Sequence, residues 1–261
     1  MPFIDSHSHL NFPQFAGDLP AVLAHAKTSG VAGMVNVGTD LATSRESIAL
    51  AEQQPYIFAT VGIHPHDATS LAADLAALTT LASHPRVLAI GEIGLDYFRD
   101  LAPRDIQKSA FIAQLELALT VKKPIVLHCR EAYSDMLEIL QAHYLGKLEG
   151  RAPGILHSFA GSAQDAADFI AAGFLLGVNN LATYPQNESI REALKDISLT
   201  KIVLETDCPF LPPQTLRGKR CEPAHIIPVA EMIAAIHSVS VVEVGLATTA
   251  NLENLLNTSW S

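Results

Sequence analysis

The stretch RDIQKSAFIAQLELALTVKKPIVLHCR, residues 104–130, contains a helical pattern followed directly by a strand pattern. Phe111, Leu115 and Leu119 recur every four residues in its first part, which predicts a helix with one buried face. Two lysines and Pro124 end the helix, and the apolar run IVLHCR follows as a buried strand. A helix that leads straight into an apolar strand is typical of a parallel sheet whose strands are linked by helices.

The same alternation extends outward from this stretch over the whole chain. Apolar runs bounded by Gly, Pro or Asn predict strands at 3–7, 33–38, 57–64, 87–94, 125–130, 154–159, 174–180 and 201–207. Further helices are predicted over 162–173, with Gly173 as the C-terminal cap, and over 223–237. Eight strands that alternate with helices predict the α/β class and a (β/α)8 TIM barrel.

Composition predicts one domain over residues 1–261, because half of the residues are hydrophobic and no linker or low-complexity tract divides them. No apolar run is long enough to cross a bilayer, and the start lacks the pattern of a secretory signal. The three cysteines cannot all pair within the chain, and Cys129 and Cys208 are expected to be small buried hydrophobes. These features predict a cytoplasmic protein without membrane association.

The charge balance excludes one class of protein. Seventeen basic and twenty-seven acidic side chains give a net charge of −10, which argues against a protein that coats nucleic acid with a broad basic surface. A phosphate-bearing substrate stays possible, because bound divalent ions can supply the local positive charge.

Potential metal ligands gather at the carboxyl ends of the predicted strands, where TIM barrels place their catalytic groups. Any one of these residues could be a buried core histidine or a loop cap, but their common placement favours a metal site. The candidate ligands are His7, His9, Glu92, His128, His157 and Asp207.

Four imidazoles and two carboxylates exceed the needs of one four-coordinate ion and predict two divalent ions. Glu92 is the predicted bridge, and Glu92 and Asp207 are the candidate catalytic carboxylates. His7, His9 and Asp207 would complete one site, with His128 and His157 at the other. A water activated by both ions is the expected nucleophile. Mg²⁺ or Mn²⁺ are the expected ions in action, and Zn²⁺ or Ni²⁺ also suit these ligands.

Seven motifs resemble those of the TatD-type metal-dependent deoxyribonucleases of the amidohydrolase superfamily, in family order and across nearly the whole chain. They are DSHSHL, GIHPHD, GEIGLDY, HCREA, LHSFAG, ETDCPFL and RGKRCEP. The resemblance implies a two-metal barrel hydrolase that acts on DNA phosphodiesters, with 3′→5′ exonuclease action on single strands. It implies the same six ligands. Cys221 departs from the family pattern, which usually has asparagine in this loop, and the C-terminal NLENLLN lacks the usual aromatic residue.

Several residues near the strand ends are candidates for binding substrate. His64 and His66 could reach a phosphate as imidazolium donors, and Arg130 could grip phosphate oxygens or orient Glu92. In the loop after the last strand, Arg217, Lys219 and Arg220 predict contacts with the DNA backbone, although such a run can be merely solvated.

Two acidic residues are expected to support the site from behind. Glu205 is interpreted as support for a metal ligand or as a buried partner of Arg130. Asp96 is expected to play a similar part.

Two rival functions remain at this point. One is an amidohydrolase-like enzyme that cleaves a cyclic amide, a lactone or a small phosphoester with the same metals. Many such enzymes bridge their ions with a modified lysine on strand four, where this chain has Glu92 and no lysine. The other rival is a metal-binding scaffold without catalysis, and no obligate protein partner is evident.

Overall fold

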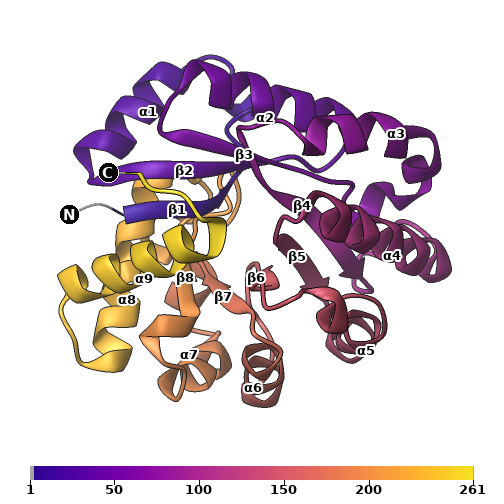
Figure 1. Ribbon diagram of the computed structural model, residues 1–261. Helices are drawn as coiled ribbons and strands as arrows, with labels where there is room; N and C mark the ends of the chain where they lie inside the picture. Colours follow the sequence, from indigo (N-terminus) through magenta and orange to yellow (C-terminus); the bar gives the residue numbers. More distant parts are fainter. Residues whose placement is uncertain (1–2, 261) are drawn as a thin grey trace. The chain divides into compact units, whose positions relative to one another are not determined.

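The computed structural model describes residues 3–260. Eight strands follow one another in chain order in one sheet, and the described pairs are parallel (Figure 1). They are β1 (Phe3–Ser8), β2 (Val31–Val37), β3 (Ile57–Val61), β4 (Val87–Asp96), β5 (Ile125–Arg130), β6 (Gly154–Leu156), β7 (Leu175–Val178) and β8 (Ile202–Leu204). This order is that of the predicted (β/α)8 barrel.

Helices separate the strands along the chain. The α-helices are α1 (Leu19–Thr28), α2 (Leu41–Gln53), α3 (Leu71–Ala82), α4 (Arg104–Val121), α5 (Tyr133–His143), α6 (Ala163–Ala171), α7 (Glu188–Lys195), α8 (Ile226–His237) and α9 (Val241–Leu256). The short 3₁₀ helices are η1 (Pro13–Phe15), η2 (Pro65–Ser70), η3 (Leu145–Lys147), η4 (Asn180–Thr183), η5 (Leu199–Lys201), η6 (Gln214–Leu216) and η7 (Pro223–His225).

Within residues 3–260, no single helix combines the length and the apolar character needed to span a membrane. One bent pair, Pro223–His237 with Val241–Leu256, meets that test by length and composition.

Two compact units make up the described chain. The first contains the residues up to Asn36, Ser158–Ile170 and the residues from Leu175 onward. The second contains Val37–His157 and Ala171–Phe174. Each unit contains one cluster of candidate ligands.

In the first unit, β1 is the central element. It pairs with β2 along one side, and Ser8 bridges to Cys208 just beyond β8 on the other. β7 pairs with β8 in turn. Every side chain of β1 is buried, as expected of a strand covered on both faces. Helix α9 packs against β1 and β8 and covers this part of the sheet (Figure 1).

In the second unit, β4 pairs with β3 and with β5, and β5 pairs with β6. Helix α4 packs against β4. It begins after Pro103 and ends at Lys122, whose φ of 57° gives the left-handed cap of a helix C-terminus. Buried Phe111 and Leu115 lie on the face predicted from the four-residue spacing.

The strands after β5 are shorter than predicted, so two candidate ligands lie in loops. β6 ends at Leu156 and β8 at Leu204, which places His157 and Asp207 beyond their strands. The backbone is left-handed at Ser158 and at Asp207, with φ of 49° and 57°, so the chain turns shortly after each of these strands.

Helix α9 is not among the helices predicted from the sequence. Its start carries a capping box, in which the Ser240 hydroxyl accepts from the Glu243 N–H while the Glu243 carboxylate accepts from the Ser240 N–H. The Ser-x-x-Glu spacing is the sequence signal that could have found it.

Candidate metal centre

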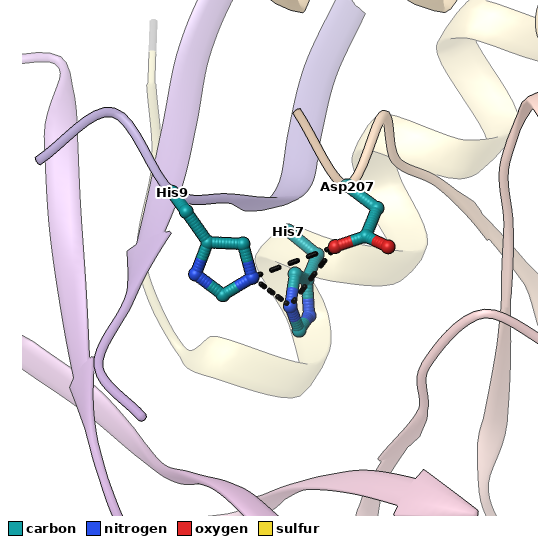
Figure 2. A group of neighbouring side chains, drawn as sticks. All are labelled: His7, His9 and Asp207. Atoms are coloured by element: carbon teal, nitrogen blue, oxygen red, sulfur yellow. Dashed lines mark hydrogen bonds and ion pairs between the residues drawn. The ribbon is translucent and has the colours of Figure 1, made fainter. Parts of the chain in front are cut away.

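The first unit brings His7, His9 and Asp207 together at the ends of β1 and β8 (Figure 2). The Nε2 atoms of the two histidines lie 3.2 Å apart, and His9 Nε2 lies 3.4 Å from Asp207 Oδ1. His7 Nε2 lies 3.9 Å from the same oxygen. Both imidazoles are almost fully buried, and the Asp207 side chain is 15% exposed. Two nitrogens and one anionic oxygen thus face one point.

Backbone hydrogen bonds hold this first cluster in place. The Asp207 N–H donates to the His7 carbonyl at 2.9 Å, and the His9 N–H donates to the Cys208 carbonyl at 2.8 Å. The end of β1 and the segment after β8 therefore run side by side, with ligands leaving from both. The predicted convergence of these three ligands follows from this parallel pairing.

Asp5 supports the backbone on both sides of the first cluster, and it is not among the residues predicted from the sequence. Its carboxylate accepts hydrogen bonds from the Thr206 N–H at 2.9 Å, from the Thr206 hydroxyl at 2.6 Å and from the His7 N–H at 3.2 Å. Complete burial raises the pKa of Asp5 to about 7, against the lowering effect of these hydrogen bonds. Its spacing of two residues before His7 is the signal that could have found it, because it places both side chains on one face.

The second unit gathers imidazoles around one oxygen of Glu92. Glu92 Oε1 lies 2.8 Å from His128 Nδ1, 3.5 Å from His64 Nε2 and 3.8 Å from His157 Nε2. Glu92 and His157 are almost fully buried. The structure thus brings the predicted ligands Glu92, His128 and His157 together and adds His64 to the residues able to hold an ion.

Asp96 lies behind this second cluster. Its Oδ2 is 3.0 Å from His128 Nε2 and 2.9 Å from His66 Nε2, and its Oδ1 accepts from the Arg99 N–H at 2.7 Å. Burial acts to raise the pKa of Asp96, but these hydrogen bonds outweigh it and hold the pKa well below the usual range. A carboxylate on the second nitrogen of a ligand histidine fixes the orientation of the ring.

His128 lies between the two carboxylates. Burial acts to lower its pKa, but the hydrogen bonds to Asp96 and Glu92 outweigh it, so the pKa of His128 is raised.

His64 differs from the other imidazoles in the direction of its hydrogen bonds. Its Nδ1 accepts from the His66 N–H at 3.1 Å, so a neutral ring carries its proton on Nε2, the atom that faces Glu92. Burial, followed by the neighbouring His128, lowers the pKa of His64 to about 4. This lowered pKa favours a neutral ring near pH 7 over the expected imidazolium form of His64.

The donor sets of both clusters fit a divalent transition metal. Bonds of about 2.0–2.2 Å to a tetrahedral or octahedral ion place neighbouring ligand atoms about 2.9–3.5 Å apart. In the first cluster, the His7–His9 and His9–Asp207 separations of 3.2 and 3.4 Å fall in this range. In the second, the His64–Glu92 separation of 3.5 Å does so, whereas the 2.8 Å between His128 and Glu92 is that of a hydrogen bond and the 3.8 Å between His157 and Glu92 is longer. Mixed imidazole and carboxylate donors suit zinc, manganese or nickel.

Glu205 is fully buried and binds the segment that follows His157. Its Oε1 accepts from the Ser158 N–H at 2.7 Å and lies 3.4 Å from Asn179 Nδ2. The carboxylate packs on Gly177, where a Cβ atom would meet Glu205 Oε2 at 2.2 Å. The absence of a side chain at position 177 makes room for this acid.

Arg130 lies at the surface, with its guanidinium 3.8 Å from the centroid of the Phe98 ring. The Phe98 ring is 51% exposed. This stacked position does not orient Glu92, which was one alternative for Arg130, and it leaves the guanidinium open to solvent.

The basic loop after β8 contains two kinds of cation. Arg220 donates to both carboxylate oxygens of Asp18, at 2.8 and 2.7 Å, and to Glu222 at 3.0 Å. These bonds, led by that to Asp18, raise the pKa of Arg220 further above its ordinary value. Lys219 and Arg217 are exposed, and Arg217 lies 5.7 Å from the Tyr184 ring centroid.

The three cysteines are free and buried, as expected for Cys129 and Cys208. Cys221, the departure from the family pattern, is also fully buried, with its sulfur 3.8 Å from Asn180 Nδ2. Its side chain therefore packs beneath the basic loop, while Lys219 lies exposed at its surface.

Comparison with known proteins gives one consistent family. The family model "TatD related DNase" matches residues 4–257. The "Uncharacterized metal-dependent hydrolase YabD" of Bacillus subtilis (strain 168) is 39% identical over 254 residues, 96% of this chain and 97% of that protein. The "3'-5' ssDNA/RNA exonuclease TatD" of Escherichia coli (strain K12) is 34% identical over 258 residues, 97% of this chain and 98% of that protein.

A solved structure confirms the predicted fold class. The crystal structure of YJJV, a TatD homolog from Escherichia coli K12, aligns with a TM-score of 0.91 and 30% identity over 98% of both chains. The motifs, the eight-stranded order and these matches agree, and the chain belongs to the TatD-related DNase family of metal-dependent hydrolases.

Proposed function

We propose that the protein is a metal-dependent exonuclease that hydrolyses phosphodiester bonds from the 3′ end of single-stranded DNA. The observation that carries the proposal is the convergence of His7, His9 and Asp207 on one point, in a chain of a DNase family. The E. coli K12 relative, named a 3'-5' ssDNA/RNA exonuclease, supports the direction and the strand form, and makes RNA a second substrate to test.

Two divalent ions per chain form part of the proposal. His7, His9 and Asp207 would hold one, and Glu92, His128 and His157 would hold the other. Such ions, when bound, polarise a phosphoryl oxygen and lower the pKa of water. We propose Mg²⁺ or Mn²⁺ as the ions in action, with Zn²⁺ or Ni²⁺ as alternatives that the imidazole-rich ligand sets also accept.

The side chains around the two clusters have separate tasks in this proposal. Asp207 and Glu92 are the catalytic carboxylates, and Asp207 is partly open to solvent, where it can accept a hydrogen bond from the attacking water. His64 is a neutral Nε2–H donor that can bind a phosphate oxygen. Asp96 and Glu205 fix His128 and the segment after His157.

Two exposed cations are proposed to contact the DNA backbone. The Arg130 guanidinium can grip a phosphate while one face rests on Phe98. Lys219 offers a charge that no described ion pair compensates within residues 3–260. The predicted contact of Arg220 with DNA has to compete with the ion pairs that Arg220 makes with Asp18 and Glu222.

The buried free thiols agree with a reducing compartment, and we propose the cytoplasm as the location of the protein.

The direct test is a time course with 5′-labelled single-stranded and double-stranded oligonucleotides, each incubated with Mg²⁺, Mn²⁺, Zn²⁺ or Ni²⁺. A 3′→5′ exonuclease shortens the labelled single strand one nucleotide at a time, and Asp207→Asn is the inactive control. Parallel assays with lactones and cyclic amides address the rival amidohydrolase activity. Turnover of those compounds without cleavage of any oligonucleotide would overturn the proposal, and no turnover at all would favour the scaffold.

Removal of metal gives a second test. We expect a chelator to abolish hydrolysis and added Mn²⁺ or Mg²⁺ to restore it without a refolding step, because extensive apolar packing supports the strands that carry the ligands. Circular dichroism before and after chelation checks that the fold is kept. Full activity in protein shown to be metal-free by elemental analysis would contradict the two-ion mechanism.

A further inference from the structure

An exposed aromatic ring lies beside the first cluster without a role in the proposed chemistry. Phe210 is 46% exposed, although a phenylalanine normally buries most of its surface. Its ring centroid lies 6.1 Å from that of the ligand His9 and 6.0 Å from that of Phe12.

The geometry of the three rings leaves Phe210 available for stacking. Phe12 stacks on His9 at 4.7 Å with an interplanar angle of 23°. The Phe210 ring makes angles of 80° with Phe12 and 67° with His9, so neither ring lies parallel to it. Phe12 supports the ligand His9, and Phe210 presents an aromatic surface to solvent.

Both phenylalanines are tied to ligands by turns of the same kind. The Phe12 N–H donates to the His9 carbonyl at 3.1 Å, and the Phe210 N–H donates to the Asp207 carbonyl at 2.9 Å. Each ring therefore follows a ligand by three residues, in a hydrogen-bonded turn that fixes its backbone to the ligand.

The loop that carries Phe210 is anchored on both sides of the ring. The Pro209 carbonyl accepts from the Cys221 N–H at 3.0 Å, and the Pro212 carbonyl accepts from the Tyr184 hydroxyl at 2.7 Å. An exposed ring on an anchored backbone binds a flat ligand at little cost in conformational entropy.

We propose that Phe210 is the stacking platform for an unpaired nucleotide base whose phosphate binds beside the first cluster, where an ion held by His7, His9 and Asp207 would offset the charge of the phosphate and of Asp207. This inference rests on the proposed function and adds a specificity determinant to it. Every base has a π-face, so such a platform accepts any sequence, but it favours strand ends whose bases are free of a duplex stack.

The test compares two single-stranded oligonucleotides that differ only at the 3′ end. One carries bases throughout, and the other has tetrahydrofuran abasic residues at its last two positions. We expect Phe210→Ala to lower kcat/KM about tenfold on the first, mainly through KM, and to leave it nearly unchanged on the second. Phe210→Tyr should retain the wild-type preference for bases, whereas Phe210→Leu should lose it.

Leu246→Ala is the matched control, because it removes a 59% exposed apolar side chain from α9, which is outside the loops that carry the rings. An equal loss by Phe210→Ala on both oligonucleotides, or no loss on either, would overturn the stacking platform while leaving the exonuclease proposal intact. If the wild-type protein cleaves neither oligonucleotide, the proposed function fails, and the inference fails with it.

Discussion

The two ligand clusters are built in different ways. In the first unit, backbone hydrogen bonds between β1 and the segment after β8 place His7, His9 and Asp207, and the three ligand atoms face one another directly. In the second unit, contacts between side chains place the candidate ligands: Glu92 Oε1 lies among three imidazoles, and Asp96 contacts His128 from behind.

Because the two clusters are held differently, we expect them to tolerate substitutions of their side chains to different degrees. A cluster placed by backbone keeps its shape when one ligand is removed, because the remaining ligands are held independently. A cluster placed by mutual side-chain contacts loses several contacts when one central group is changed. Substitutions in the second cluster should therefore have the larger effects.

The largest effect is expected for Glu92→Gln compared with His7→Ala. Glutamine keeps the size of the side chain but removes the anionic charge around which three imidazoles gather. We expect hydrolysis to fall at least about a thousandfold, and by less for His7→Ala, since water can replace one lost ligand. Elemental analysis should find about one ion per chain in His7→Ala.

The same measurement addresses the predicted bridging by Glu92. A bridging carboxylate predicts that Glu92→Gln retains fewer than about one ion per chain, whereas a ligand of the second cluster alone predicts about one. If Glu92→Gln retains two ions and near-normal turnover, Glu92 is neither a bridging carboxylate nor a ligand of the second cluster.

The next effect is expected for Asp96→Asn. Loss of the charge behind His128 should weaken metal binding and activity by about 10- to 100-fold, because the imidazole loses the partner that orients it. Asp100→Asn is the matched control, since Asp100 is a surface residue that pairs with Arg104. Metal titration monitored by activity and by direct binding is the measurement. If the two variants bind metal equally well, side-chain support is not what distinguishes the second cluster.

A smaller effect, on stability, tests the close packing in the first unit. Gly177→Ala should lower the free energy of unfolding by about 1–3 kcal/mol, because the new Cβ would meet Glu205 Oε2. Gly146→Ala is the control: a Cβ at that position has no neighbour within 4 Å, and the change should be neutral or slightly stabilising. Urea unfolding measures both. Equal stabilities would mean that the Glu205 carboxylate can move aside and does not hold the Ser158 segment in one place.

The smallest effect concerns the basic loop. Lys219→Ala should reduce the slope of log affinity against log salt by about 0.7 for single-stranded DNA, the share of one phosphate contact. Arg220→Gln should change the slope far less, because Asp18 and Glu222 already neutralise its guanidinium. Binding titrations at several salt concentrations decide this. A reduction of about 1.4 in the double variant would instead restore both residues as phosphate contacts.

The sequence predicts that His7, His9 and Asp207 lie together, and the structure confirms this, because strand ends in a parallel sheet share one edge. His7 and His9 follow from strand alternation, and the alternation of strands and helices predicts the barrel. The loops after β6 and β8 could not be predicted in this way, since a left-handed residue at Asp207 ends the alternation.

Side chains that are far apart in the sequence but hydrogen-bonded in the fold could not be predicted either. Asp18 lies 202 residues from Arg220, and Thr206 lies 201 residues from Asp5. No periodicity indicates such pairs, so a residue that appears to be a free cation in the sequence is held by two carboxylates in the fold. Gly177 illustrates the same point, because its role depends on an acid from another strand end.

The left-handed backbone at Asp207 limits the residue types that fit this position without strain. Asparagine and glycine adopt a φ near 57° readily but bring no negative charge, and histidine brings no anionic oxygen. Glutamate adopts such a φ in this protein, with 55° at both Glu131 and Glu149, but its side chain is one methylene longer and would place the carboxylate differently. Aspartate meets both requirements, because it adopts this conformation more readily than most residue types and would bring an anionic oxygen to the proposed ion. The residue at position 207 is therefore constrained by its backbone conformation as well as by the charge that the proposed ion requires.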